Sequence, residues 1–194
     1  PIHFRQVTTA RGLDLVRAAK AKGLPVTCGI TPAHLFLSDT AIGDFRTFAR
    51  LSPPLRSEAD RLASIAAVAD GTIDVITSGH DPRGPEDKRL PFADAAPGMA
   101  GAETLLALSL NLVREGHVSI NRLMTLLSAN PARILGVDAG SFAPGSAADL
   151  IFIDPDAPWI VDSTRMAASA GNTPFDKVPV QGRARRVMKG GTFL

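Results

Sequence analysis

The stretch Ile73-Asp74-Val75-Ile76-Thr77-Ser78-Gly79-His80-Asp81-Pro82-Arg83 decides the fold. Its first half is a short apolar run rich in β-branched residues, which predicts a buried strand. A glycine and a proline then end the strand and begin a loop that carries His80, Asp81 and Arg83. In parallel α/β proteins the chemistry lies at the carboxyl ends of strands, so this loop is the first candidate site. The alternative is a polar turn in which Asp81 only caps a bend.

The segments upstream of this strand predict a parallel arrangement. Strands are expected over residues 2–7 and 25–30, and helices over 8–23 and 57–71, where hydroxyl side chains can cap the helix starts. The resulting order β-α-β-α-β indicates a parallel sheet with right-handed crossovers. Residues 31–56 are expected to form a long loop, and long loops in compact domains are often functional.

Downstream of the strand the pattern changes twice. After a second long loop over 84–100, leucine-rich helices are expected over 103–114 and from residue 119, where Asn130-Pro131 breaks the helix. Two short strands over 149–154 and 159–161, and further strands over 178–187 and 192–194, then predict a small β part. We therefore expect a boundary near residue 140, with an α/β domain over 1–139 and a β domain over 140–194.

Composition excludes several classes of protein. The 194 residues are 45% hydrophobic, and 21 basic against 19 acidic side chains give a formal charge of +2, so we expect no nucleic-acid partner. Cys28 is the single cysteine, which excludes an intrachain disulfide and fits a reducing cytoplasm. No apolar run approaches the roughly 20 residues of a membrane helix, and we expect no membrane partner. A start at Pro1 without methionine suggests a fragment of a longer protein.

Several motifs in a fixed order resemble the carboxyl half of a dihydroorotase of the amidohydrolase superfamily. They cover nearly the whole chain. The matching stretches are Val26–Cys28, Thr31–Leu35, Ser52-Pro53-Pro54-Leu55-Arg56, Asp70–Ile76, Pro91-Phe92, Gly101–Thr104, Asn130-Pro131-Ala132-Arg133-Ile134-Leu135-Gly136, Gly145–Asp156 and Asn172-Thr173-Pro174-Phe175.

The resemblance implies an α/β fold built on a TIM-type (β/α)8 barrel with a small β-sandwich formed by both ends of the chain. These 194 residues supply only the last three βα units and the carboxyl part of the sandwich. Because three strands cannot close an eight-stranded barrel, the missing amino-terminal half is an expected partner. The family's paired histidines and bridging residue for zinc lie in that half.

The family's reaction is the reversible ring opening of dihydroorotate in pyrimidine biosynthesis, in which zinc activates water and polarises the ring carbonyl. This sequence departs from the family at four positions. Gln6 stands where relatives have a metal-binding His, and Gly79 where they have a catalytic Asp. Arg83 replaces a His that resembles a substrate contact, and Ser52 replaces an Asn. We therefore expect this chain to contribute no complete zinc site.

Two interpretations follow. In the first, zinc chemistry is impaired or lost, because a ligand and the proton shuttle are missing together. In the second, Asp81 moves into the space left by Gly79, with His80 beside it, and these two side chains are the candidate catalytic residues. The candidate substrate-binding residues are Arg83, Ser52, Arg56 and Gly98; the two arginines could form an anion pocket, or instead pair with Glu58 and Glu86 on the surface.

The resemblance leaves three functions open. The first is a dihydroorotase-like hydrolase with impaired chemistry. The second is a noncatalytic subunit that packs against aspartate carbamoyltransferase and stabilises it. The third is hydrolysis of another cyclic amide, as in hydantoinases and allantoinases. A homo-oligomer is expected in each case.

Overall fold

The computed structural model describes residues 1–168 and 170–194. The amino-terminal elements are β1 (Ile2–Phe4), α1 (Ala10–Ala21), β2 (Val26–Ile30), α2 (Pro32–Phe36), η1 (Asp39–Ile42), η2 (Thr47–Ala49), α3 (Glu58–Ala69), β3 (Val75–Ile76) and α4 (Pro85–Lys88). They are followed by α5 (Leu105–Ser109), α6 (Asn111–Arg114), α7 (Ile120–Met124), η3 (Thr125–Ala129), α8 (Asn130–Leu135), β4 (Leu150–Ile160), η4 (Ser163–Arg165), β5 (Pro179–Lys189) and β6 (Thr192–Phe193).

The first three strands form a parallel sheet in the order β1-β2-β3, which confirms the predicted parallel α/β arrangement. Strand β3 is shorter than the predicted run. The backbone pairing nevertheless extends beyond it on both sides, because the amide of Asp74 donates to Cys28 O and that of Thr77 to Ile30 O, each at 2.9 Å. The three strands thus end side by side, at the same edge of the sheet.

The two long helices of this part begin where the sequence predicts. The hydroxyl of Thr9 accepts from the amide of Gly12 at 3.2 Å, and the hydroxyl of Ser57 accepts from the amide of Asp60 at 3.3 Å. Each bond satisfies an amide in the first helical turn that has no partner within its helix. At the other end of α1, Gly23 has a φ of +73°, as expected for a glycine that follows a helix.

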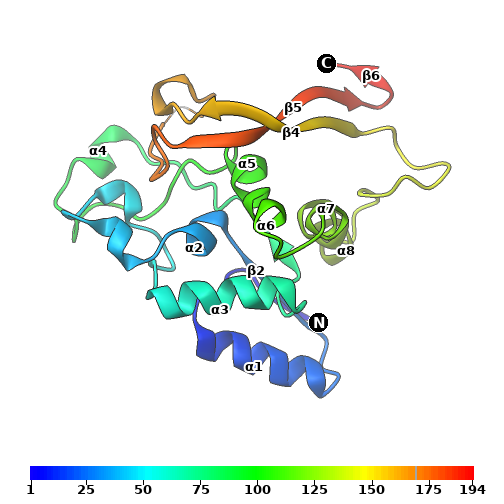
Figure 1. Cartoon of the computed structure of the whole chain (residues 1–194), viewed down its shortest axis with the longest axis horizontal. Helices are drawn as coiled ribbons and strands as arrows, with labels where there is room; N and C mark the ends of the chain where they lie inside the picture. Colours follow the sequence, from blue (N-terminus) through cyan, green and yellow to red (C-terminus); the bar gives the residue numbers. More distant parts are fainter. Residues whose placement is uncertain (169) are drawn as a thin grey trace.

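A half-buried ion pair ties α1 to the sheet. The ammonium of Lys20 lies 2.8 Å from the carboxylate of Asp74, which also accepts the amide of Cys28 at 2.8 Å. These contacts fix the ends of the strands that lie away from the polar loops. Helices α1 and α3 lie side by side on one face (Figure 1).

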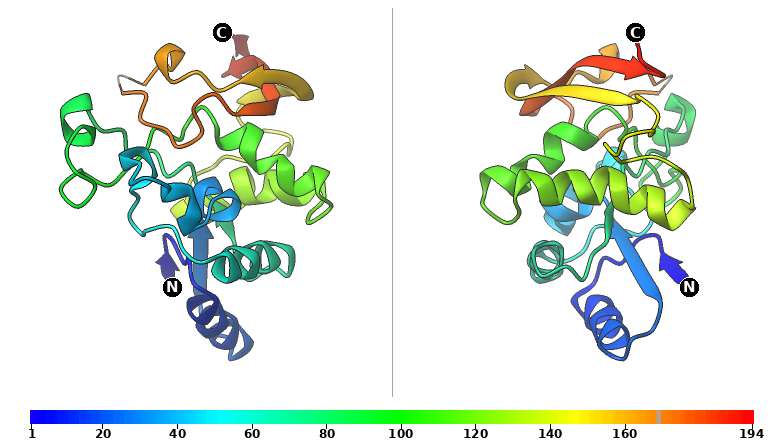
Figure 2. Two further views of the ribbon diagram at one scale, coloured as in Figure 1. Left: turned by 60° about the vertical axis from the view of Figure 1, so that its left-hand side comes forward. Right: turned by 90° about the vertical axis from the view of Figure 1, so that its right-hand side faces the viewer.

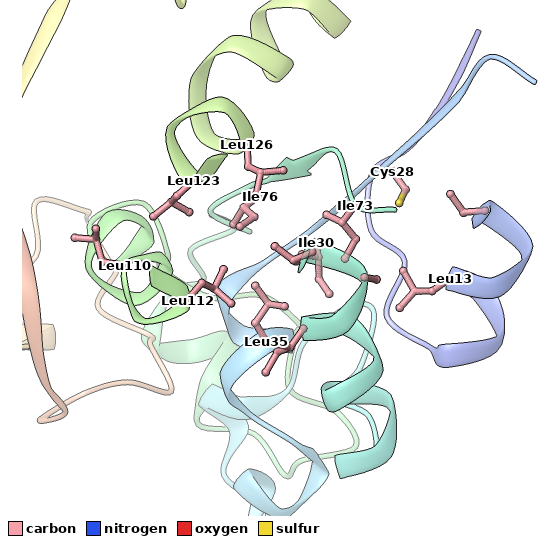
Figure 3. Close-up of a cluster of buried hydrophobic side chains, with 14 residues drawn as sticks. Leu13, Cys28, Ile30, Leu35, Ile73, Ile76, Leu110, Leu112, Leu123 and Leu126 are labelled. Atoms are coloured by element: carbon pink, nitrogen blue, oxygen red, sulfur yellow. The ribbon is translucent and has the colours of Figure 1, made fainter. Parts of the chain in front are cut away.

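The main hydrophobic core lies between the parallel strands and the surrounding helices (Figure 3). Leu13 of α1, Ile30 of β2 and Ile76 of β3 point into it, and Leu112 and Leu123 close it from the other side. All five side chains are at most 2% exposed, so burial of apolar area is the main source of stability here.

The last three strands form a separate antiparallel sheet in the order β4-β5-β6. The two short strands expected over 149–154 and 159–161 are in fact one strand, β4, with register shifts between Phe152 and Ile153 and between Asp154 and Pro158. Since prolines lack an amide hydrogen, a strand that contains Pro155 and Pro158 stays in the sheet through such irregularities. Helix α1 and this sheet lie at opposite ends of the molecule, with α5 to α8 between them (Figures 1 and 2).

Three further expectations about local structure are wrong. The loop over 31–56 contains α2, η1 and η2, and the loop over 84–100 contains α4. Both α helices have a proline in their first turn, where its fixed φ favours helix and its missing amide costs nothing. Asn130-Pro131 does not break the helix, because η3 is a π-helical turn that accommodates the proline at the start of α8.

The boundary near residue 140 stays a prediction. A second hydrophobic cluster contains Leu51 and Leu108 together with Val161 and Val180, so side chains from before and after that position share a core. Within residues 1–168 and 170–194, no helix is both long enough and apolar enough to cross a membrane.

Candidate active site

A cavity of about 420 Å³ lies at the carboxyl ends of the parallel strands. Gln6 follows β1, Thr31 follows β2, and the loop from Gly79 to Asp81 follows β3. Parallel pairing brings these three chain segments together, as the sequence predicts. The cavity is lined by Arg5, Gln6, Thr31, His34, Leu51, Ser52, Thr77, Ser78, Gly79, His80, Asp81, Gly98 and Met99.

His34 is a structural residue of the cavity wall. Its Nδ1 lies 2.7 Å from the hydroxyl of Thr31, and its Nε2 lies 2.9 Å from Pro53 O. A carbonyl can only accept, so Nε2 carries the proton and Nδ1 accepts from the hydroxyl. Burial lowers the pKa of His34 below its ordinary value, which keeps the ring neutral. Both ring nitrogens are therefore used within the protein.

Gly79 leaves a gap where the resemblance predicts a carboxylate. Its φ is +61°, a conformation that L side chains rarely adopt. A Cβ at this position would lie 2.9 Å from Cγ2 of Thr31 and 3.4 Å from Cβ of the same residue. The backbone and the threonine methyl group together disfavour a side chain at this position.

The next residue, His80, has a defined tautomer. Its Nδ1 accepts the amides of Gly101 and Ala102, at 3.3 and 3.2 Å. A neutral ring in this arrangement carries its proton on Nε2. Because His80 is exposed and lines the cavity, it can offer one N–H donor to a ligand.

Asp81 lines the cavity but is held in another direction. Its amide donates to Met99 O at 2.8 Å, and its carboxylate pairs with the guanidinium of Arg83 at 2.8 Å. The side chains of this pair are 55% and 38% exposed, which makes the pair weak. The carboxylate of Asp81 is therefore paired with Arg83, and this ion pair must break before the carboxylate can move toward Gly79.

The two candidate arginines have other partners than those considered from the sequence. Arg83 donates to Pro97 O at 3.0 Å and pairs with Asp81, and Arg56 donates to the hydroxyl of Thr8 at 3.2 Å. Neither is among the described residues that line the cavity. The surface pairs with Glu58 and Glu86 are not formed by these arginines, because Arg61 and Arg89 occupy the two carboxylates.

Ser52 and Gly98 are both among the residues that line the cavity. Gly98 is buried, with a φ of +133°, and its amide donates to Arg50 O at 3.0 Å. Its carbonyl accepts the side-chain amide of Asn172, also at 3.0 Å, so both backbone polar groups of Gly98 have partners within the protein.

The described residues do not form a zinc site by themselves. They contain no group of three or more His, Cys, Asp or Glu side chains that could hold a metal. At the position where the resemblance predicts a histidine ligand, Gln6 Oε1 is buried and has no hydrogen-bond partner among these residues. A neutral amide oxygen is a poor zinc ligand compared with imidazole.

Sequence reasoning missed two residues at or near the site: Thr31, which lines the cavity, and Lys88, which is buried close to it. Thr31 directly follows β2, and the parallel register places it opposite Thr77, two residues before Gly79. Lys88 has no local signal, since it lies in a stretch that reads as a polar loop. Its ammonium is buried and donates to Thr47 O, Arg50 O and Ala96 O, at 3.1, 3.4 and 2.7 Å.

Lys88 predicts a measurable pH dependence of stability. Burial, together with the nearby Arg83 and Arg50, lowers its pKa from 10.5 to about 8. Between these values the unfolded chain binds a proton that the folded chain does not, so the free energy of unfolding rises with pH across this window. From about pH 8 to pH 10, we expect the free energy of unfolding of the wild type to increase by about 2 kcal/mol relative to that of the Lys88→Met variant. Urea unfolding of both proteins checks this, and parallel curves contradict it.

The comparisons with known proteins agree with this geometry. Residues 7–194 match the model of the amidohydrolase family, and the chain belongs to that family. A dihydroorotase of Geobacter metallireducens is 42% identical over 194 residues, which cover 100% of this chain and 46% of the relative. A dihydroorotase of Anaplasma phagocytophilum is 38% identical, in a match that covers 97% of this chain and 42% of the relative. These relatives confirm the resemblance found in the sequence.

Solved structures give the same family from the fold. An L-hydantoinase (dihydropyrimidinase) from Arthrobacter aurescens superposes with a TM-score of 0.92 at 29% identity, covering 98% of this chain and 44% of that one. A dihydropyrimidinase from Brevibacillus agri superposes with a TM-score of 0.91 at 25% identity. The chain thus spans a little under half the length of the relatives that it matches.

Proposed function

We propose that this chain is the carboxyl-terminal part of a dihydroorotase-like cyclic amidohydrolase in which metal-dependent ring opening is impaired or lost. The observation that carries the proposal is Gly79, which has no side chain where the reaction requires a carboxylate and whose φ and contact with the Thr31 methyl group disfavour one. Gln6, in the place of a histidine ligand, supports it. The rest of the intact protein supplies the other barrel strands and the remainder of the sandwich.

The cavity keeps features of a binding site for a polar ring. Nε2 of His80, the ring nitrogen that Gly101 and Ala102 leave free, offers a donor, and the hydroxyl of the exposed Ser52 can donate or accept. Such groups can pair with the N–H and C=O groups of a cyclic amide. The structure thus supports binding of the ring more than its hydrolysis.

The proposal is tested by measuring the metal content and the turnover of the intact protein. On this proposal the protein is cytoplasmic. We expect substoichiometric zinc and dihydroorotate hydrolysis at least about 10²-fold slower than that of the Geobacter relative assayed in parallel. Stoichiometric zinc with turnover comparable to the relative overturns the proposal.

A hydantoinase-like specificity is the second candidate, because the solved structures that superpose on the chain are hydantoinases and dihydropyrimidinases. A panel of hydantoin, dihydrouracil and dihydroorotate separates the two, with dihydroorotate preferred on the first proposal. A noncatalytic role beside aspartate carbamoyltransferase, and a homo-oligomeric state, are proposals that size-exclusion chromatography with and without that enzyme tests.

A further inference from the structure

Asn172 belongs to the Asn-Thr-Pro-Phe stretch, to which the proposed function gives no role. It lies between η4 and β5, far along the chain from the strand ends, and it is only 3% exposed. A buried amide is costly unless its donor and acceptor are both satisfied, so its partners show what it does.

The side chain of Asn172 joins two segments of the cavity wall. Its Oδ1 accepts the amide of Arg83 at 3.0 Å, and its Nδ2 donates to Gly98 O at 3.0 Å. Its backbone carbonyl also accepts the amide of Ala100 at 2.9 Å. An amide N–H can only donate and a carbonyl can only accept, so these partners fix which end of the side chain faces which segment.

The two joined segments hold the candidate ligand contacts. His80 and Asp81 lie just before Arg83, and Gly98 and Met99 also line the cavity. The two segments are neighbours, since the amide of Asp81 donates to Met99 O and His80 forms an isolated parallel bridge with Met99. The way the two segments pack on each other therefore determines the shape of this part of the cavity wall.

We infer that Asn172 is a positioning residue for the cavity, which fixes the 80–83 segment against the 98–100 segment from outside. The inference rests on the proposed function for its ligand, but the positioning stands on the hydrogen bonds alone. The asparagine amide places a donor and an acceptor on two separate atoms of one short side chain, so each segment is held by its own atom. An aspartate at this position places a carboxylate oxygen against Gly98 O and leaves a buried charge without a donor there.

Asn130 provides a matched control. It is also a buried asparagine, 5% exposed, whose Nδ2 donates to Asp74 O at 2.8 Å and whose Oδ1 accepts from Arg133 at 3.0 Å. It is not among the described residues that line the cavity. Asn130→Asp and Asn172→Asp thus make the same chemical change at two buried sites, and only one of them adjoins the cavity.

The experiment compares both variants with wild type in the intact protein, by hydrogen–deuterium exchange and by calorimetric titration with dihydroorotate. We expect both variants to lose stability. We expect only Asn172→Asp to accelerate exchange at Met99, Ala100 and Arg83, and to weaken dihydroorotate binding by about tenfold or more. Asn172→Ser, which keeps one hydroxyl, serves if the aspartate variant does not fold.

The outcomes separate the two proposals. If Asn172→Asp and Asn130→Asp change exchange around the cavity equally, or not at all, the positioning inference is wrong. If wild type shows no dihydroorotate binding, the proposed ligand is wrong, while the exchange data still decide the role of Asn172. Faster exchange in the Asn172 variant without loss of affinity shows that the segments are positioned for something other than this ligand, which contradicts the inference as stated.

Discussion

Gly79→Asp is expected to destabilise the intact protein by about 2 to 4 kcal/mol. The replacement restores the residue type found at this position in the family, yet the backbone has a φ of +61° and the new Cβ meets Cγ2 of Thr31 at 2.9 Å. Aspartate tolerates a left-handed backbone better than most residues, so the larger part of the cost comes from the methyl contact. Urea unfolding measures the change.

Thr31→Ser is the matched second change. Serine removes Cγ2 but keeps the hydroxyl that lies 2.7 Å from Nδ1 of His34. We expect the double variant Thr31→Ser/Gly79→Asp to recover about 1 kcal/mol or more relative to the sum of the single changes, as a coupling between contacting residues. Strict additivity of the two changes, or a Gly79→Asp protein as stable as wild type, contradicts the steric explanation.

This pair also shows what sequence reasoning could and could not predict. That Gly79 has no side chain where the resemblance implies a carboxylate is evident from the sequence. That a carboxylate cannot simply be put back depends on Thr31, 48 positions away in the numbering, and on a φ value. Contacts between neighbouring strands of a parallel sheet are set by register, which the sequence does not state.

In the fold, too, local features were predictable from the sequence and contacts between distant segments were not. Thr9 and Ser57 were predictable as helix starts because a cap is a local arrangement of a hydroxyl and an amide three residues on. Helix α2 and the continuous passage through Asn130-Pro131 are not predictable from the sequence, because a proline is compatible both with a break and with the first turn of a helix. The burial of Lys88 is not predictable from the sequence, since its three carbonyl partners come from two segments that lie far apart in the chain.

Gly98→Ala is expected to be the most damaging single change in the cavity wall, with a loss of about 4 kcal/mol or more in the free energy of unfolding. A Cβ at this position would lie 2.4 Å from Asp81 O and 2.9 Å from Asp81 Oδ2. The first of these atoms is a backbone carbonyl oxygen, and the amide of the same residue pairs with Met99 O, so a backbone shift at Asp81 strains that pairing. A φ of +133° adds strain.

Gly116→Ala separates the strain from the contact. Gly116 has a φ of +76°, but no described atom lies within 4 Å of its added Cβ, so this variant reports the cost of a positive φ alone, about 1 kcal/mol. We expect Gly98→Ala to exceed it by about 3 kcal/mol in urea unfolding of the intact protein and to abolish dihydroorotate binding. If the two variants lose the same free energy of unfolding and dihydroorotate binding is retained, the 98–100 segment can shift to accommodate the methyl group. The close contact between Gly98 and Asp81 would then not determine the shape of the cavity.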